Sequence, residues 1–384
     1  MGRFRDALAA PGLGAIAEVK RRSPSAGDLR PDADPARLAT QFANAGAAAV
    51  SILVDERFGG SLDDLRAARA ATQLPLLAKG FFTEELQLLQ LKTAGADAVL
   101  LLLRDLDDAR TRELLTYARE LGLDALVEAH DADELARATK LDAQVIGINA
   151  RDLTTFEIDR RAQLELVSRS PRDRVVVAES GVWTRAQGAA AELAGADAIL
   201  VGSALMRAPD PAAKLRELLS RPLVKVCGMT KQDDVDVAVD AGADLVGFIL
   251  AKESPRRADA VLDVPDTTLS VAVFVGEPEE TRADLVQLYA RDRDHRARDA
   301  KLLRDGEEVA TVIDLPWQQR DPLHFQRAAA TEGRVMLAGK LDPENVQEAV
   351  RAVRPWAVDA SSRLEVEPGV KDHEKVRQFV AAAR

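Results

Sequence analysis

The chain has 384 residues, which is long enough for two domains of barrel size or slightly less. Its 63 acidic and 52 basic residues give a net charge of −11, which disfavours nucleic acid and anionic membranes as partners. A single cysteine, Cys227, excludes an internal disulfide and is typical of a reducing cytoplasm. No apolar stretch approaches the roughly 20 residues of a membrane span, and residues 1–6 lack the apolar segment of a signal peptide. We therefore expect a cytoplasmic protein that binds neither nucleic acid nor membrane.

Apolar runs recur every 20 to 30 residues through the first half, and several end in polar residues able to take part in chemistry. Eight candidate strands precede residue 205: 16–20, 47–53, 74–79, 98–104, 125–128, 145–149, 175–180 and 198–203. Amphipathic helical stretches separate them, such as 83–94, 108–121 and 185–194. Parallel strands that are buried on both sides read as apolar runs. The pattern therefore predicts an α/β fold, a (β/α)8 TIM barrel whose polar strand ends line one mouth.

The second half repeats this pattern in fewer residues. A new apolar run begins at Leu223, and the phrase Ala-Gly-Ala-Asp of 94–97 and 194–197 returns at 241–244. We divide the chain into domains 1–221 and 222–384. The second has about 160 residues, against the 200 or more usual for a TIM barrel. Six strands are clear, 286–289 is a doubtful seventh, and the charged stretch 291–306 favours a helix or solvated loop. We predict a shortened TIM-barrel-like domain whose closure the sequence leaves open.

Polar residues at the strand ends of the first half form the first candidate site. They are Glu18, Lys20, Lys79, Glu128, Asn149, Arg151, Glu179, Ser180, Gly181, Gly202 and Ser203. Carboxylates and lysines in one mouth supply general acids and bases whose pKa values their neighbours can separate. Glycines after the last two strands are typical of barrels that hold a phosphate on backbone N–H groups, although each glycine alone is more often a plain turn. We expect a small phosphorylated substrate.

Motifs across residues 1 to about 220 resemble the indole-3-glycerol-phosphate synthase family. They lie at 17–25, 58–62, 76–79, 127–128, 146–153, 177–182 and 200–203, in family order. The resemblance implies ring closure of 1-(2-carboxyphenylamino)-1-deoxyribulose 5-phosphate with loss of carbon dioxide and water. The sequence shows no metal constellation or dinucleotide fingerprint, so we expect no metal or cofactor. The sequence departs from the family at Gly80, where an aspartate is usual, at Val54, and in an N-terminal helix shortened to about residues 3–9, which would leave the mouth more open.

The same resemblance implies a role for each polar residue. Lys79 would donate a proton to the developing alkoxide, and Glu128, partnered by Glu18, would act as the acid of dehydration. Glu179 would organise the lysines. The remaining residues would bind substrate: Lys20 its carboxylate or phosphate, Asn149 its oxygens, and a phosphate set made of Ser23, Arg151, Gly181, Gly202 and Ser203, with Ser180 at the same edge.

The second half resembles phosphoribosylanthranilate isomerase, which is commonly fused to the synthase in this order. The main motifs lie at 224–230, 254–256, 337–346 and 358–362. The resemblance implies an Amadori rearrangement with Cys227 as general base, Asp314 as general acid and Arg256 at the substrate. Departures include Tyr289 in place of a histidine, Lys340 and Arg363 in place of glycines, residues 316–321 in place of a glycine-rich loop, and about one missing βα unit.

Several alternatives stay open on the sequence alone. The second half is either a working, compressed isomerase or a non-catalytic packing domain. The first half is alternatively another phosphate-binding barrel, such as an epimerase or an aldolase with Lys79 as Schiff-base nucleophile. A non-enzymatic scaffold would make the ionisable strand ends dispensable. The four histidines fit no metal-ligand spacing. We expect a monomer that acts on small phosphorylated, anthranilate-derived substrates.

Overall fold

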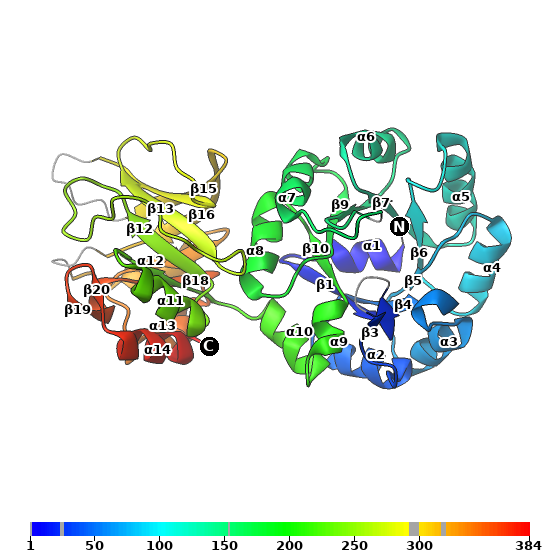
Figure 1. The fold of residues 1–384 in the computed structure, drawn as a ribbon, viewed down its shortest axis with the longest axis horizontal. Helices are drawn as coiled ribbons and strands as arrows, with labels where there is room; N and C mark the ends of the chain where they lie inside the picture. Colours follow the sequence, from blue (N-terminus) through cyan, green and yellow to red (C-terminus); the bar gives the residue numbers. More distant parts are fainter. Residues whose placement is uncertain (1, 24–26, 153, 292–298, 316–319) are drawn as a thin grey trace. The chain divides into compact units, whose positions relative to one another are not determined.

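The chain separates into two compact units. The computed structural model describes residues 2–23, 27–152, 154–291, 299–315 and 320–384. One unit comprises Met1–Trp183 and Gly188–Leu219, and the other comprises Thr184–Gln187 and Ser220–Arg384. Each contains a closed eight-stranded barrel (Figure 1). None of the helices in the described ranges has the length and apolar character needed to cross a membrane.

The first barrel is built entirely from parallel strands, which confirms the predicted TIM barrel. Its strands are β1 (Gly14–Val19), β4 (Ala49–Leu53), β5 (Leu76–Lys79), β6 (Ala98–Leu102), β7 (Asp124–Ala129), β8 (Val145–Asn149), β9 (Val175–Glu179) and β10 (Ala198–Val201). The helices that follow them in the chain are α2 (Pro35–Asn44), α3 (Leu62–Ala71), α4 (Glu85–Thr93), α5 (Asp108–Glu120), α6 (Ala132–Lys140), α7 (Arg160–Arg169), α8 (Arg185–Ala194), α9 (Ser203–Arg207) and α10 (Pro211–Leu219). These helices form a ring around the strands (Figure 1).

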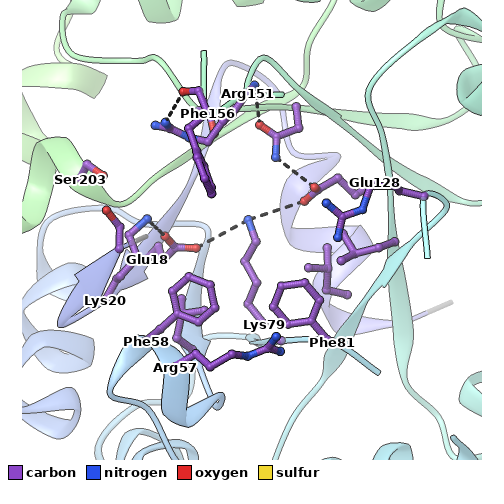
Figure 2. A pocket seen from close by; sticks show the side chains of 18 residues that line it. Glu18, Lys20, Arg57, Phe58, Lys79, Phe81, Glu128, Arg151, Phe156 and Ser203 are labelled. Atoms are coloured by element: carbon purple, nitrogen blue, oxygen red, sulfur yellow. Dashed lines mark hydrogen bonds and ion pairs between the residues drawn. The ribbon is translucent and has the colours of Figure 1, made fainter. Parts of the chain in front are cut away.

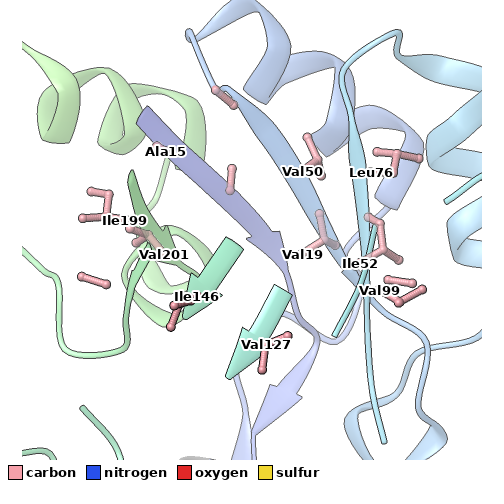
Figure 3. Close-up of a cluster of buried hydrophobic side chains, with 14 of the residues drawn as sticks. Ala15, Val19, Val50, Ile52, Leu76, Val99, Val127, Ile146, Ile199 and Val201 are labelled. Carbon is pink, nitrogen blue, oxygen red and sulfur yellow. The ribbon is translucent and has the colours of Figure 1, made fainter. Parts of the chain in front are cut away.

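Alternation along each strand decides which side chains enter the barrel. In β1, Ala15 and Val19 face outward into the apolar layer shared with the helices (Figure 3). Ile16 faces inward and belongs to the separate cluster that fills the barrel. Two residues further along, Glu18 takes the same inward direction at the carboxyl end of the strand. The same alternation carries Lys79 inward after Leu77.

The short helix α1 (Arg3–Leu8) closes the amino-terminal end of the first barrel. Phe4 and Leu8 are fully buried in the interior cluster. The backbone N–H groups of Phe4 and Arg5 donate to Oδ2 of Asp124, the first residue of β7, at 3.1 and 3.0 Å. The segment that the sequence compares with the family's N-terminal helix therefore lies at the end of the barrel opposite the polar strand ends.

The repeated phrase Ala-Gly-Ala-Asp has one structural role at all three places. Its glycine ends a turn in the left-handed region, and its aspartate accepts a backbone N–H from a neighbouring strand. Oδ2 of Asp97 accepts from Leu76 at 3.0 Å, and Oδ2 of Asp197 accepts from Val176 at 2.8 Å. In the second barrel, Oδ2 of Asp244 accepts from a β11 N–H at 2.9 Å. The aspartate of each phrase therefore fixes the start of the neighbouring barrel strand.

The second barrel also closes with eight strands, although not all are parallel. They are β11 (Leu223–Cys227), β12 (Leu245–Ile249), β13 (Leu269–Val275), β14 (Leu285–Tyr289), β15 (Asp299–Arg304), β16 (Glu307–Ile313), β17 (Val335–Leu337) and β18 (Ala357–Ala360). The helices of this barrel are α11 (Gln232–Asp240), α12 (His324–Ala330), α13 (Val346–Val353) and α14 (His373–Ala382). Strand β15 runs antiparallel to both β14 and β16.

The expectation of a helix or loop across 291–306 is therefore wrong for β15, while residues 292–298 lie outside the described residues. Ala300 and Leu302 alternate with charged residues and are buried, a strand pattern that the surrounding charges hide. Asp305 and Gly306 both have positive φ, as in a two-residue hairpin turn. A hairpin needs two connecting residues where a parallel crossover needs a dozen or more, so the barrel closes in a short chain.

Candidate active sites

A cavity of about 330 Å³ opens at the carboxyl ends of the strands in the first barrel (Figure 2). Its lining combines ionisable and aromatic side chains: Glu18, Lys20, Ser23, Leu53, Arg57, Phe58, Lys79, Gly80, Phe81, Leu100, Leu102, Arg104, Glu128, Asn149, Arg151, Phe156, Ser180 and Ser203. The structure thus brings together most of the residues predicted from the first half. The buried Glu179 lies beside Lys79, and Gly181 and Gly202 belong to the loops that follow β9 and β10.

Lys79, at the end of β5, is surrounded by three buried carboxylates. Its Nζ lies 2.6 Å from Oε2 of Glu179. The same Nζ lies 3.6 Å from Oε2 of Glu18 and 3.8 Å from Oε2 of Glu128. These four residues come from β1, β5, β7 and β9, so closure of the barrel is what gathers them. One ammonium therefore lies close to three carboxylates.

The cluster separates the pKa values of its members. Burial lowers the pKa of Lys79, but the surrounding carboxylates outweigh burial and hold it above its ordinary value. Burial raises the pKa of Glu179 to about 8, because the nearby negative charge of Glu128 reinforces burial against the attraction of Lys79. Burial also acts on Glu128, yet His130, Lys79 and a hydrogen bond from Asn149 lower its pKa to about 2. The cluster therefore holds an ammonium, an ionised Glu128 and a Glu179 that can carry a proton at neutral pH.

A second lysine and an amide fix two of the carboxylates. Nζ of Lys20 lies 2.8 Å from Oε1 of Glu18, and this pairing outweighs burial and lowers the pKa of Glu18. Nδ2 of Asn149 donates to Oε1 of Glu128 at 3.0 Å. The Oδ1 of Asn149 accepts from the backbone N–H of Arg151 at 3.0 Å, so the amide group has a fixed orientation (Figure 2).

Some of the predicted phosphate residues line this cavity. Ser23, Arg151 and Ser203 belong to its lining. Ser180 has φ of +67°, a strained value for a residue with a side chain, and such strain is typical of functional sites. A Cβ at Gly202 would lie 2.4 Å from Oε1 of Glu18, so a glycine is required there to seat the carboxylate.

The cavity lining also includes aromatic and aliphatic side chains, which the sequence did not predict as site residues. Phe58 and Phe81 stack with ring centroids 6.3 Å apart, and the guanidinium of Arg57 lies 4.2 Å from the Phe81 centroid. Leu100 and Leu102 come from β6, whose inward positions carry no charge. An aromatic ring fits such a surface. The predicted strand 98–104 ends in the polar Arg104, and the apolar Leu100 and Leu102 before it gave no signal of a binding surface.

His130, which follows β7, is another site residue that was not predicted from the sequence. Its Nε2 lies 3.2 Å from Oε1 of Glu128, and its Nδ1 lies 3.0 Å from Oε2 of Glu134. Burial lowers the pKa of His130, but the two carboxylates outweigh burial and raise it to about 10. Glu128 therefore has an imidazolium beside it.

The second barrel has a smaller cavity of about 190 Å³ at the corresponding strand ends. It is lined by Cys227, Ile249, Arg256, Val273, Gln287, Tyr289, Asp314, Leu315, Ala338, Gly339, Lys340, Leu341, Asp359, Ser361, Ser362 and Arg363. Cys227 and Asp314, predicted as base and acid, thus share one cavity with Arg256. Burial raises the pKa values of the Cys227 thiol and of Asp314.

Two cationic residues line this cavity, one held by an ion pair and the other in a strained backbone conformation. Nε of Arg256 donates to Oε1 and Oε2 of Glu365 at 3.0 and 2.8 Å. Lys340 has φ of +60°, so it adopts the left-handed conformation of the glycine it replaces and bears a backbone cost of roughly 1–2 kcal/mol. Within the described ranges, no group of three or more histidine, cysteine, aspartate or glutamate side chains is arranged to hold a metal ion.

Each of the two barrels matches a known protein family. Residues 2–218 match the family model "Indole-3-glycerol phosphate synthase". A relative with that name from Nocardioides sp. is 49% identical over 210 residues, which cover 54% of this chain and 81% of the relative. The chain belongs to the indole-3-glycerol phosphate synthase family. A second synthase, from Mycobacterium ulcerans, is 46% identical over 215 residues and covers 56% of this chain and 79% of its own length.

The second barrel of this synthase-family chain matches a different model. Residues 295–382 match "N-(5'phosphoribosyl)anthranilate (PRA) isomerase". A "Multifunctional tryptophan biosynthesis protein" from Phycomyces blakesleeanus is 32% identical over 477 residues and covers 96% of this chain. The chain spans about three fifths of the length of such multifunctional relatives. The predicted fusion of a synthase-family barrel with an isomerase-family barrel is confirmed.

Proposed function

We propose that the first barrel closes the indole ring of 1-(2-carboxyphenylamino)-1-deoxyribulose 5-phosphate, with loss of carbon dioxide and water. The observation that carries this proposal is the Lys79 ammonium, held by three carboxylates in a cavity whose lining also includes Phe58 and Phe81. The substrate has the matching features, an anthranilate ring and a phosphorylated chain. Family membership supports the same reaction.

The cluster supplies the proton transfers that this reaction needs. Attack of the aromatic ring on the ketone builds negative charge on the ketone oxygen, and Lys79 is the protonated group placed to neutralise it. Loss of water then needs an acid and a base. We assign these roles to Glu128 and Glu18, as the sequence predicts. Because the charges around Glu128 keep it ionised at neutral pH, it must take up a proton before it can act as the acid.

We further propose that the second barrel carries out the Amadori isomerisation of phosphoribosylanthranilate, with Cys227 as base and Asp314 as acid. A domain that served only for packing would gain little from an ion pair in its interior, because removing each charge from water costs several kcal/mol and apolar residues of similar size are often as stable. Here Lys225 is fully buried and paired with Asp359 at 2.8 Å, directly under the cavity that holds Cys227 and Asp314. This arrangement favours a working isomerase over a non-catalytic remnant.

An aldolase is the main competing activity for the first barrel. Schiff-base formation needs a neutral amine, whereas the carboxylates around Lys79 keep it protonated. We expect no covalent adduct when the protein is treated with borohydride in the presence of the carboxyphenylamino substrate. A trapped adduct on Lys79, found by mass spectrometry, would replace the synthase proposal with an aldolase mechanism.

The direct test of the synthase proposal is to supply the carboxyphenylamino substrate and quantify indole-3-glycerol phosphate by indole fluorescence. Glu128→Gln and Lys79→Met should each abolish most of the product, while Glu113→Gln on the exposed face of α5 should not change the rate. Product formed equally by all four proteins would contradict the site assignment.

A cytoplasmic location and a monomeric state stay predictions, and a solution mass of 41.5 kDa is expected for a monomer.

A further inference from the structure

Four polar side chains of the second barrel, three of which line its cavity, form one continuous hydrogen-bonded chain. Nζ of Lys225 in β11 donates to Oε1 of Gln287 in β14 at 2.5 Å. Nε2 of Gln287 donates to the hydroxyl of Tyr289 at 2.9 Å. That hydroxyl donates to Oδ2 of Asp314, which follows β16, at 2.8 Å. The chain therefore connects three strands and ends on the residue assigned as the acid.

The direction of every bond in this chain is set by the first residue. An ammonium has donors and no acceptor, so Gln287 must turn its oxygen toward Lys225. Its amide nitrogen then donates to Tyr289 and occupies a lone pair of the phenol oxygen. The phenol proton is left to point at Asp314. The Oδ1 of Asp314 accepts from the backbone N–H of Leu315 at 2.7 Å, so both carboxyl oxygens have fixed partners.

The origin of the chain lies beside the other reacting group. Lys225 and Cys227 are two residues apart in β11 and project to the same, inner side of the barrel. A Cβ at Gly247 would lie 2.6 Å from Sγ of Cys227 and 3.0 Å from Cε of Lys225, so this glycine makes room for both side chains. Nζ of Lys225 also donates to Oδ2 of Asp359 at 2.8 Å, which neutralises the buried ammonium.

We propose that Lys225, Gln287 and Tyr289 are positioning residues that fix the Tyr289 hydroxyl as a hydrogen-bond donor to Asp314. The inference rests on the proposed isomerase function of this barrel. In the acid step, the O–H bond of Asp314 breaks, its proton forms a new O–H bond on the furanose ring oxygen, and the ring C–O bond opens. The negative charge left on Asp314 then receives the Tyr289 hydrogen bond, which favours the transfer. Tyr289, which replaces the family's histidine, thereby stabilises the carboxylate form of Asp314.

Two conservative variants test the chain through the isomerase kcat. Tyr289→Phe removes the donor, and Gln287→Glu keeps the acceptor for Lys225 but turns the Tyr289 proton away from Asp314. Both should lower kcat roughly 10- to 100-fold, as expected for losing a hydrogen bond to a charged group, with little change in KM. The limb of the pH profile that reports the acid should move to higher pH. Tyr117→Phe in α5, the control, should keep the normal kcat.

A spectroscopic readout tests the same contact without isomerase activity. The protein has two tyrosines, so Tyr117→Phe leaves Tyr289 as the only tyrosine that can ionise. Burial and the charge of Asp314 raise the pKa of Tyr289 well above its ordinary value. Ultraviolet titration of that variant should show no ionisation near pH 10, and a further Asp314→Asn change should lower the titration point.

The outcomes separate the two levels of the proposal. Wild-type kcat and pH profile in both Tyr289→Phe and Gln287→Glu would overturn the positioning role. A Tyr289 that ionises near pH 10 whether or not Asp314 is present would overturn the contact itself. Wild-type protein without isomerase activity would contradict the proposed function of the barrel, and the titration would still decide whether Tyr289 donates to Asp314.

Discussion

At the scale of single residues, Lys79 is the point on which the first site depends. Its ammonium lies within 4 Å of the carboxylates of Glu18, Glu128 and Glu179 and interacts with all three. The strand-end pattern predicted all four residues, because inward alternation and barrel closure follow from the apolar runs. Their protonation was not predictable, since it arises from distances between strands that are far apart in sequence.

Replacing Lys79 should therefore have two effects. Lys79→Met removes a general acid, and we expect the synthase kcat to fall roughly 100- to 10,000-fold. It also removes one of the two cations that lower the pKa of Glu18, so that pKa should rise. The rate is measured with the carboxyphenylamino substrate. Lys79→Arg keeps the charge with different geometry and serves as the comparison: a rate equal to wild type in either variant would show that Lys79 is not the acid.

His130 gives a prediction with a definite pH dependence. Its pKa rises from 6.5 to about 10 on folding, so the stability it contributes is fully present below pH 6.5 and is lost as pH rises through 10. His130→Gln should therefore destabilise the protein most at pH 6 and no longer do so above pH 10. Urea unfolding at pH 6, 8 and 10 measures this difference. A difference that stays constant over the range would mean that His130 is neutral in the folded protein.

At the scale of elements, the loops after the strands determine how the strand-end side chains are accommodated. Gly202, between β10 and α9, was predicted to bind phosphate, and the structure adds that it accommodates the carboxylate of Glu18. Gly202→Ala would place a Cβ 2.4 Å from Oε1 of that residue. We expect the Glu18–Lys20 pair to be displaced and the synthase rate to fall at least tenfold. A crystal structure of the variant with Glu18 unmoved would contradict this explanation.

Lys340 follows β17 in a conformation that suits glycine. Lys340→Gly should relieve the strain and stabilise the protein by about 1 kcal/mol. If the cation is retained because it faces the phosphate of the substrate, the same variant should raise KM of the isomerase reaction with little change in kcat. Thermal unfolding and steady-state kinetics measure the two effects. A stabilised variant with unchanged KM would leave Lys340 without a role in binding.

At the scale of the whole molecule, the sequence predicted two barrels but not how the second one closes. The missing information was in β15, where the charges of Asp299, Lys301 and Arg304 mask the buried Ala300 and Leu302. An antiparallel hairpin has no place in an alternating βα pattern, so counting βα units left one short. Similarly, the chain from Lys225 to Asp314 joins residues 89 positions apart and exists only in the closed barrel.

Because each barrel has its own cavity and its own set of polar residues, the two reactions should be separable by mutation. The most direct measurement supplies freshly made phosphoribosylanthranilate to the full-length protein and quantifies indole-3-glycerol phosphate. We predict product from the wild type and none from Cys227→Ala, while Cys227→Ala still converts the carboxyphenylamino intermediate. Wild-type protein that makes product only from the intermediate would show that the second barrel is not an isomerase, and no product from either compound would contradict the account of both sites.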